Sequence, residues 1–416
     1  MSKHLLKEIT SKIGSGATPT GGKGAYKGGD YSLIRSQNVL DISFLREGLV
    51  YINDEQAKKL DGVKVESGDV LFNITGDSIC RCCIVPDDIL PARVNQHVAI
   101  IRPKSVNSAY LMYYLQYLKP YLMSICGNGS SRNALTKDSL EKLEIEISPF
   151  SNSIAEILSS LDKKIINNKR ITSELESFAK TIYDYWFLQF EFPNEEGKPY
   201  KSSGGKMVWC EELKREIPEG WEACKLKDEA LLIKDGTHNP PKRVMTGIPL
   251  LTGTMFGNCF LEYGKATYVS ETDYHSIHSQ YQPAEDDIVI TKIGTIGNVN
   301  MLTKRDIPIT IHCNSAIIRM KDLYKKAFQV CLFKSDEFQK RLRAVKGRSI
   351  QEFISLDKIS NVLFLKPNQS IVKKFNELCN IYIQEMSVLQ QQNDNLIALR
   401  DFLLPMLMNG QVTFKD

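Results

Sequence analysis

The stretch that decides the fold is IAEILSSLDKKIINNKRITSELESFAKTIYDYW, residues 154–186. Apolar side chains recur there in steps of four and three residues, which is the spacing of a coiled-coil seam. At about 1.5 Å per residue, a helix from Ser153 to Leu188 is about 55 Å long, a length typical of a spacer. The predicted seam positions are Ile154, Leu158, Leu161, Ile165, Asn168, Thr172, Leu175, Ala179, Ile182 and Trp186.

The same register returns 217 residues later, in IVKKFNELCNIYIQEMSVLQQQNDNLIALRDFL, residues 371–403. Each seam is interrupted near its middle by polar residues, which commonly fix the register of paired helices. Two helices of this kind in one chain favour a paired-helix spacer over ordinary core helices. The second set of predicted seam positions is Ile371, Phe375, Leu378, Tyr382, Glu385, Leu389, Gln392, Leu396, Leu399 and Leu403.

The segments outside the helices repeat with the same period. The tetrapeptide Ala-Ile-Ile-Arg occurs at 99–102 and again at 316–319, and the turn glycines Gly76 and Gly294 are 218 residues apart. Short β-rich runs alternate with glycine-rich turns and some helix, so both segments are expected to be α+β and the chain an internal, pseudo-twofold duplication. The expected division is a globular domain over 1–149, a helix over 150–190, a linker over 191–220, a second domain over 205–367, a second helix over 368–408 and a tail over 409–416.

Composition sets limits on the function. The net charge is only +4, so any nucleic-acid binding must come from local clusters of basic residues. No apolar run approaches the roughly 18 residues of a membrane span, and we expect a cytoplasmic protein. Its ten cysteines should then remain thiols, and no zinc site is expected because the lone Cys-x-x-Cys has no second pair.

Several short motifs imitate enzyme signatures. Asn239-Pro240-Pro241-Lys242 resembles the motif that holds a flipped adenine in methyltransferases, but lysine stands where an aromatic ring must stack on the base. The chain has no Gly-Lys-Ser/Thr loop for nucleotide phosphates, and His275 and His278 lack the spacing of a zinc protease helix. We therefore expect no catalytic residues, no metal and no cofactor in this chain.

Polar and basic residues gather instead on turns between apolar strands, in both repeats. Arginine can bond guanine with two hydrogen bonds, asparagine and glutamine can bond adenine, and hydroxyls and amides can hold phosphates. One such residue alone is more often a solvated turn, but the repeated set predicts a DNA-binding surface. The candidates are Arg35, Gln37, Asn38, Arg93, Asn95, Gln96, Ser130, Arg132 and Asn133 in the first repeat, and Lys234, His238, Lys242, Arg243, Lys292, Thr295, His312, Asn314, Arg348 and Gln351 in the second.

In this order the motifs resemble the specificity subunit of type I restriction-modification systems, and the resemblance covers essentially the whole chain. Its carriers include Gly16-Ala17-Thr18-Pro19, Leu33 to Asn38, Gly68 to Gly76, and the helix from Ile157 to Phe187. Ile217-Pro218-Glu219-Gly220-Trp221 is similar to the opening of that family's second recognition domain. The first helix departs from the family pattern, because Ser151-Asn152-Ser153 lacks the usual glutamine.

The resemblance implies two target-recognition domains, each reading half of a split DNA site, and an antiparallel helix pair that sets the gap. It also implies partners: double-stranded DNA, two methyltransferase subunits that bind S-adenosylmethionine, and restriction subunits that use ATP and Mg to translocate and cut. The methyltransferase subunits are expected to dock on the helices. The alternative is a stand-alone coiled-coil scaffold or DNA-binding protein that never joins a methyltransferase.

Overall fold

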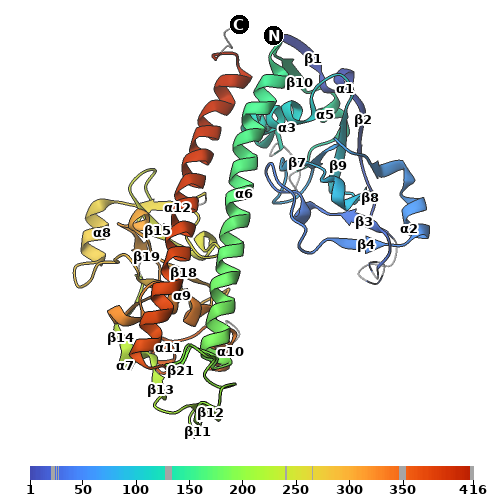
Figure 1. Cartoon of the computed structure of the whole chain (residues 1–416). Helices are drawn as coiled ribbons and strands as arrows, with labels where there is room; N and C mark the ends of the chain where they lie inside the picture. Colours follow the sequence, from blue (N-terminus) through green and yellow to red (C-terminus); the bar gives the residue numbers. More distant parts are fainter. Residues whose placement is uncertain are drawn as a thin grey trace. The chain divides into compact units, whose positions relative to one another are not determined.

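The computed structural model describes residues 1–19, 24, 26, 28–126, 134–238, 241–264, 266–345 and 353–412 (Figure 1). The chain forms two compact units. Unit 1 consists of Met1–Ile165 and Asn395–Asp416, and unit 2 consists of Ile166–Asp394. Each unit therefore contains one of the two sequence repeats together with part of both long helices.

Unit 1 is built on two four-stranded sheets. One has the order β2-β9-β6-β7, with β2 (Thr10–Ser15), β9 (Val98–Pro103), β6 (Val70–Asn73) and β7 (Cys82–Ile84). The other has the order β4-β3-β8-β5, with β4 (Val50–Ile52), β3 (Tyr31–Ile34), β8 (Ala92–Val94) and β5 (Lys64–Val65). The remaining elements are β1 (Ser2–Leu5), which pairs with β10 (Glu144–Ile147), and the helices α1 (Leu6–Ile9), α2 (Asp54–Lys59), α3 (Ser108–Tyr117), α4 (Lys119–Cys126) and α5 (Lys137–Glu141).

Strand alternation explains why unit 1 has three layers. Side chains of successive strand residues point to opposite faces of a sheet. Phe72 of β6 and Ile101 of β9 pack in one apolar cluster with Tyr110 of α3. Their neighbours Leu71 and Ile100 belong to another cluster, formed with the second sheet. The β2-β9-β6-β7 sheet is consequently covered by α3 on one face and by the second sheet on the other.

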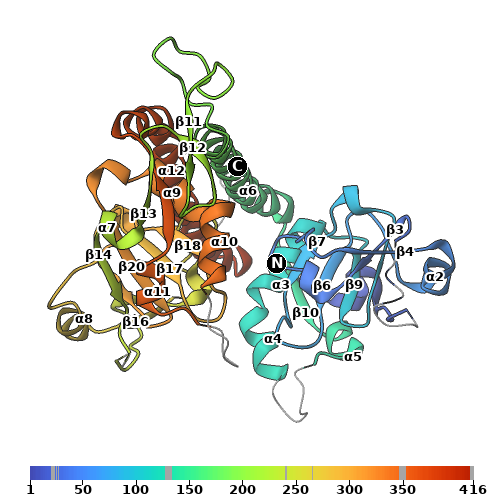
Figure 2. The ribbon, with the colours of Figure 1, turned by 90° about the horizontal axis from the view of Figure 1, so that it is seen from below.

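Unit 2 has the same plan (Figure 2). Its main sheet has the order β14-β20-β17-β18, with β14 (Ala230–Asp235), β20 (Ser315–Met320), β17 (Ile288–Thr291) and β18 (Val299–Met301). A second sheet contains β16 (Thr267–Val269), β15 (Ile248–Leu251) and β19 (Thr310–Ile311). The other elements are the pair β13 (Glu222–Lys225) and β21 (Leu363–Lys366), with α7 (Leu226–Glu229), α8 (Glu271–Ile277), α9 (Ala327–Lys334), α10 (Asp336–Ala344) and α11 (Leu356–Ser360).

The two main sheets share more than their strand order. In unit 1 the buried carboxylate of Asp69 accepts a hydrogen bond from Arg102 Nε at 2.7 Å, and in unit 2 Asp287 accepts one from Arg319 Nε at 2.7 Å. Both aspartates are fully buried, and each arginine forms two bonds to its carboxylate. The α+β class and the internal duplication predicted from the sequence agree with this repeated architecture.

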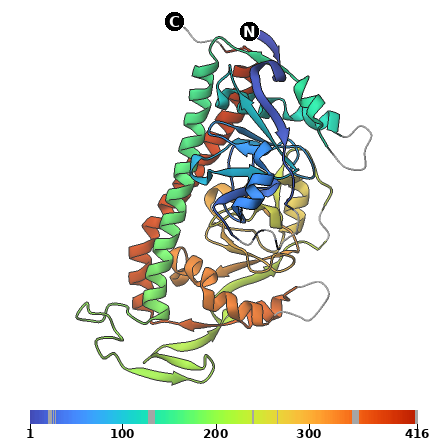
Figure 3. The ribbon, with the colours of Figure 1, turned by 90° about the vertical axis from the view of Figure 1, so that its right-hand side faces the viewer.

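The segment between the units' repeats adds a feature to unit 2. Strands β11 (Met207–Cys210) and β12 (Arg215–Pro218) form an antiparallel hairpin. Figure 3 shows this hairpin beside the end of α6 and the start of α12. Phe192 stacks on Tyr200 and on Trp221, with ring centroids 4.6 and 4.9 Å apart, so the predicted linker is largely ordered and packed.

The long helices are α6 (Ser151–Tyr183), which ends in a π-helical turn at Asp184–Leu188, and α12 (Gln369–Met408). They lie side by side (Figures 1 and 3). Residue numbers rise along one helix as they fall along the other, so the pair is antiparallel. The contacts that show this are Asn168 with Gln392, Phe178 with Tyr382 and Trp186 with Phe375 in unit 2, and Asp162 with Arg400 in unit 1.

The predicted seam of α12 is wrong at Leu378, Glu385, Gln392 and Leu399, which are exposed. Leu378 is 44% exposed, whereas Cys379 and Met386 are fully buried. A heptad that starts at Val372 explains the burial. Because Ile371 is also apolar, the sequence pattern placed alternate seam positions one residue too early. The other predicted pairing residues are buried or half-buried: Ile154, Leu158, Leu161, Ile165, Leu175, Ile182, Ile371, Phe375, Tyr382, Leu389 and Leu396.

Candidate nucleic-acid interface

Three turns meet at one edge of the main sheet in unit 1. Thr75, in the turn after β6, shares a hydrogen bond of 2.6 Å with Nδ1 of His97 in the turn before β9. Gln96 bonds the other ring nitrogen of His97 at 3.1 Å, and the hydroxyl of Thr18 donates to the Gln96 side chain. Threonine, glutamine and histidine side chains from three distant segments are thereby gathered in one polar cluster.

A glycine allows the third turn to approach. The amide of Gly16 donates to the carbonyl of Asn95 at 3.1 Å, and a Cβ at Gly16 would lie 1.7 Å from the Val94 carbonyl oxygen. Any side chain there would separate the turn after β2 from the turn before β9. Gly236 has the same role in unit 2, where an added Cβ would lie 2.3 Å from the His312 carbonyl oxygen.

The corresponding three turns meet in unit 2. Thr237 pairs with His312 through a parallel bridge, and the Lys292 amide donates to the Asn314 carbonyl at 2.8 Å. The ammonium group of Lys292 lies 2.7 Å from Asp235, whose other oxygen lies 3.4 Å from His238. The same edge of the repeated sheet is thus polar in both units, although the side chains differ.

Unit 2 carries more positive charge at this edge. Lys242 and Arg243 are exposed in the segment that follows Gly236. Burial, together with the neighbouring Arg243 and His238, lowers the pKa of His312. The imidazole is consequently held neutral near pH 7, and a neutral imidazole has one nitrogen that accepts a hydrogen bond. In fact its Nδ1 accepts from the Asn314 amide at 3.2 Å.

Two predicted phosphate-binding loops lead into these edges. Thr75 forms an isolated bridge with Ala134, and Ile293 forms one with Phe353. Ala134 directly follows the predicted loop of the first repeat, and Phe353 follows that of the second. The predicted residues within the loops, Ser130, Arg132, Asn133, Arg348 and Gln351, lie outside the described residues.

Proteins of a known family resemble this chain. The family model described as Type I restriction modification DNA specificity domain matches residues 5–177, a stretch that includes the Thr75, Gln96 and His97 cluster. The Type I restriction enzyme MjaIX specificity subunit of Methanocaldococcus jannaschii is 26% identical over 99% of this chain and 93% of its own length. These two matches support a specificity subunit of a type I restriction-modification system.

Further relatives have the same description. The Type I restriction enzyme HindI specificity subunit of Haemophilus influenzae is 22% identical over 91% of this chain and 94% of its own length. The crystal structure of the S subunit from M. genitalium superposes with a TM-score of 0.54 at 14% identity, covering 100% of this chain and 96% of that one. This structural likeness supports the fold of the specificity subunit.

Three predicted DNA-binding residues of the specificity subunit have structural roles instead. Arg93 is 4% exposed, donates to the carbonyls of Ala57 and Ala92, and pairs with Asp61 at 3.0 Å. The buried Asn38 side chain bonds the Leu45 carbonyl at 3.0 Å. Asn95 is 7% exposed, and its side chain accepts from the His97 amide. These groups are inaccessible to a base, and the prediction that they contact DNA is wrong.

The remaining candidate residues differ in their hydrogen-bond partners and in their exposure. Arg35 and Gln37 both donate to the carbonyl of Gly48. Lys292 is 6% exposed and neutralised by Asp235, so it supports the edge from within. The predicted residues that lie at the two edges with accessible polar groups are Gln96, His238, Lys242, Arg243, Thr295, His312 and Asn314, while Lys234 is exposed on β14.

Two residues at the unit 1 edge, Thr75 and His97, were not among the candidates. The internal repeat carries a signal for His97, because it corresponds to the candidate Asn314 at the spacing of the duplication, but none for Thr75, whose counterpart is the apolar Ile293. In the described part of the chain, no cluster of three or more potential metal ligands occurs, and no helix is long and apolar enough to cross a membrane.

Proposed function

We propose that this specificity subunit reads a double-stranded DNA target in two halves, one with each polar edge. The observation that carries the proposal is the repetition of the same three-turn edge, at equivalent places of equivalent sheets, with different side chains in the two units. A shared scaffold with different polar groups is what an asymmetric, split target requires. Base edges in the major groove are distinguished by the pattern of hydrogen-bond donors and acceptors presented to them.

The chemistry is assigned to partner subunits. We infer that this chain makes and breaks no bond itself, because the edges combine amides, hydroxyls and imidazoles without an activated nucleophile. S-adenosylmethionine would be bound by two methyltransferase subunits that modify adenine, and ATP and Mg by restriction subunits that translocate and cut. The exposed apolar side chains of the helix pair, among them Ile166, Phe178 and Ile381, support docking of the methyltransferase subunits there. Such a complex would work in the cytoplasm, where the DNA is.

Linking the two recognition units explains how two polar edges that each bind DNA weakly can together give a specific complex. Each half-site alone would bind weakly, but when one is bound the second contact becomes intramolecular. The helices would then decide which gap between half-sites is accepted. A stand-alone scaffold that never joins a methyltransferase remains the alternative to be excluded by experiment.

The test is to co-express the chain with the methyltransferase subunit of its system in a host without DNA methylation. Modified adenines are then mapped by long-read sequencing. A single split motif with a fixed gap is expected. A stable complex that produces no modified motif, or a contiguous one, would contradict the proposal and favour the scaffold.

A further inference from the structure

Helix α9 of unit 2 is not capped by its own residues. The residue before it, Lys326, has φ 67° and provides no side-chain cap. The first two amides of the helix donate instead to α12: Ala327 N to Asn380 Oδ1 at 3.1 Å, and Phe328 N to Asn376 Oδ1 at 2.9 Å. The equivalent helix of unit 1, α3, is capped locally by Asn107, which accepts from two of its amides.

The side-chain amide of Asn376 both accepts and donates a hydrogen bond. Its oxygen accepts from the Phe328 amide, and its Nδ2 donates to the carbonyl of Leu323 at 3.0 Å, in the turn before α9. Asn376 and Asn380 are four residues apart and therefore lie on one face of α12. Two points of attachment along the helix axis resist rotation of α9 against α12 in a way that one would not.

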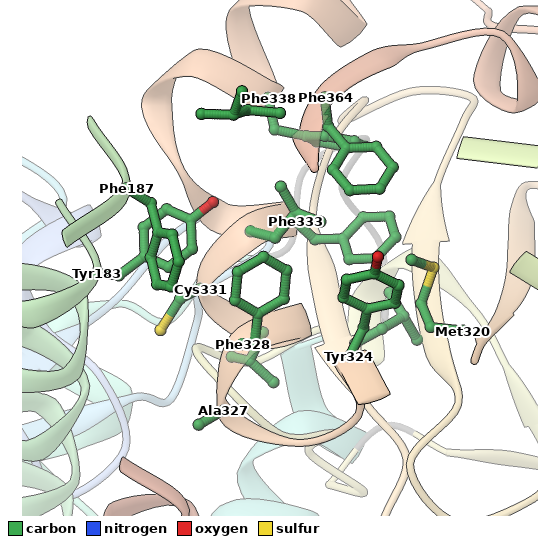
Figure 4. Packing of buried hydrophobic residues seen from close by; sticks show 14 of the residues in the cluster. Tyr183, Phe187, Met320, Tyr324, Ala327, Phe328, Cys331, Phe333, Phe338 and Phe364 are labelled. Atoms are coloured by element: carbon green, nitrogen blue, oxygen red, sulfur yellow. The ribbon is translucent and has the colours of Figure 1, made fainter. Parts of the chain in front are cut away.

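Aromatic packing surrounds this attachment. Phe328 contacts Tyr183 and Phe187 of the α6 end, with ring centroids 5.7 and 5.0 Å apart, and Phe375 of α12 at 6.3 Å. Figure 4 shows Phe328 beside Tyr183 and Phe187, with Cys331 one turn further along α9. Nonpolar packing of this kind binds the helices together but has little directional preference. The asparagine bonds supply the direction.

The other end of the α9–α10 segment reaches the candidate DNA-binding edge. Gln329 of α9 donates to the carbonyl of Asp286 at 2.7 Å, just before β17. Gln339 of α10 donates to the carbonyl of Gly297 at 2.9 Å, in the turn between β17 and β18. Gly297 has φ 93°, and a Cβ there would lie 2.5 Å from Gln339 Oε1. Gln339 also donates to the carbonyl of Phe333 in α9 at 2.7 Å, so hydrogen bonds join α12 through α9 to the turn that contains Thr295.

We propose that Asn376 and Asn380 are positioning residues that set the angle of the second recognition unit on α12, and so the gap between half-sites that the subunit accepts. The inference rests on the proposed function and adds to the helix length a second determinant of the gap. One more base pair moves a half-site by about 3.4 Å along the duplex and turns it by about one tenth of a helical turn. A rigidly held unit distinguishes such steps, and a loosely held one accepts neighbouring gaps.

The test measures gap selectivity in the complete complex with its methyltransferase subunits. The substrates are duplexes carrying the two half-sites of the wild-type motif at the native gap and at gaps one base pair shorter and longer. For Asn376→Ala with Asn380→Ala, we expect the preference for the native gap over its neighbours to fall about 10-fold, because both directional attachments of α9 to α12 are lost. Asn395→Ala, an exposed asparagine of the same helix, is the matched control.

Conservative variants separate positioning from folding. Asn380 only accepts a hydrogen bond, so Asn380→Asp should retain the wild-type gap preference, while Asn380→Leu should lose it. Gln339→Ala, at the far end of the path, should relax base discrimination in the second half-site only. The inference is overturned if the folded Asn380→Leu variant and the double variant keep the wild-type preference. A wild-type complex without any split motif would instead overturn the proposed function.

Discussion

A guanidinium group can serve DNA binding or the fold, and burial separates the two roles in this subunit. Arg93 is enclosed between the Ala57 carbonyl, Asp61 and the ring of Tyr31, 5.4 Å away. Arg243 is exposed in the segment after Gly236. The first arginine should matter for stability, and the second for affinity.

The Arg93→Ala variant is expected to lower the free energy of unfolding of unit 1 by about 1–3 kcal/mol, because three hydrogen bonds and the packed stem are lost. Urea unfolding followed by circular dichroism measures this. Arg243→Ala should change stability by less than about 0.5 kcal/mol. It should reduce by about one the slope of the logarithm of DNA affinity against the logarithm of salt concentration. An Arg93→Ala variant with wild-type stability would contradict the structural role.

The burial of His278 predicts that the stability of unit 2 depends on pH. It is 1% exposed and packs between Tyr274 and Tyr281, with ring centroids 5.0 and 5.1 Å apart. Burial lowers the pKa of His278 to about 4. Between the ordinary pKa of about 6.5 and this value the unfolded chain binds the proton and the folded chain does not, so stability falls as the pH falls.

The expected loss is about 1–3 kcal/mol between pH 6.5 and pH 4. Tryptophan fluorescence during urea unfolding reports it, because the three tryptophans, Trp186, Trp209 and Trp221, all belong to unit 2. His278→Leu should remove this part of the pH dependence, while His275→Leu, on the exposed side of α8, should keep it. A His278→Leu variant with the same slope as the wild type would refute the assignment.

At this scale the sequence predicted the type of residue at the interface better than its identity. Gln96, His312 and Asn314 lie at the polar edges, but Arg93 and Asn38 do not, because their partners are elsewhere in the chain. Whether a polar side chain faces solvent depends on such distant contacts, which no local pattern carries. The repeat could have identified His97, since its counterpart Asn314 was a candidate.

The helix pair depends on which residues form the seam of α12. Met386 is fully buried, and Leu378 is 44% exposed. Met386→Ala should therefore lower the free energy of unfolding by about 2–5 kcal/mol, and Leu378→Ala by less than about 1 kcal/mol. Tryptophan fluorescence during urea unfolding compares the two. Equal losses, or a larger one for Leu378→Ala, would restore the register first inferred from the sequence.

The length and helical type of α6 and α12 could be predicted from the sequence, but the face of α12 that is buried could not. Periodicity predicts a long amphipathic helix, and both helices occur, but a run with apolar residues at both 371 and 372 fits two registers equally well. The phase is decided by what the helix packs against. On α12 these are the side chains of α6 and of α9, including Phe328, which meets Phe375.

The internal duplication governs the whole molecule. Two units with the same strand order and the same buried Asp–Arg pair present two polar edges, and the helices α6 and α12 pass through both units. The duplication is visible in the sequence because buried strands and ion pairs tolerate little change. The identity of the target bases is not visible in the sequence, because base recognition depends on the conformation of the turns and on DNA shape.

The most direct test of the account lengthens the helix pair without altering either unit. Seven residues are inserted after Ile165 in α6 and seven after Asp394 in α12, where the two units divide. One heptad preserves the seam and adds about 10.5 Å, equivalent to at most about three base pairs. Mapping of modified adenines should then return the same two half-sites with a longer gap. The original gap, read by a stably assembled complex, would contradict the claim that the helices separate two readers of one split site.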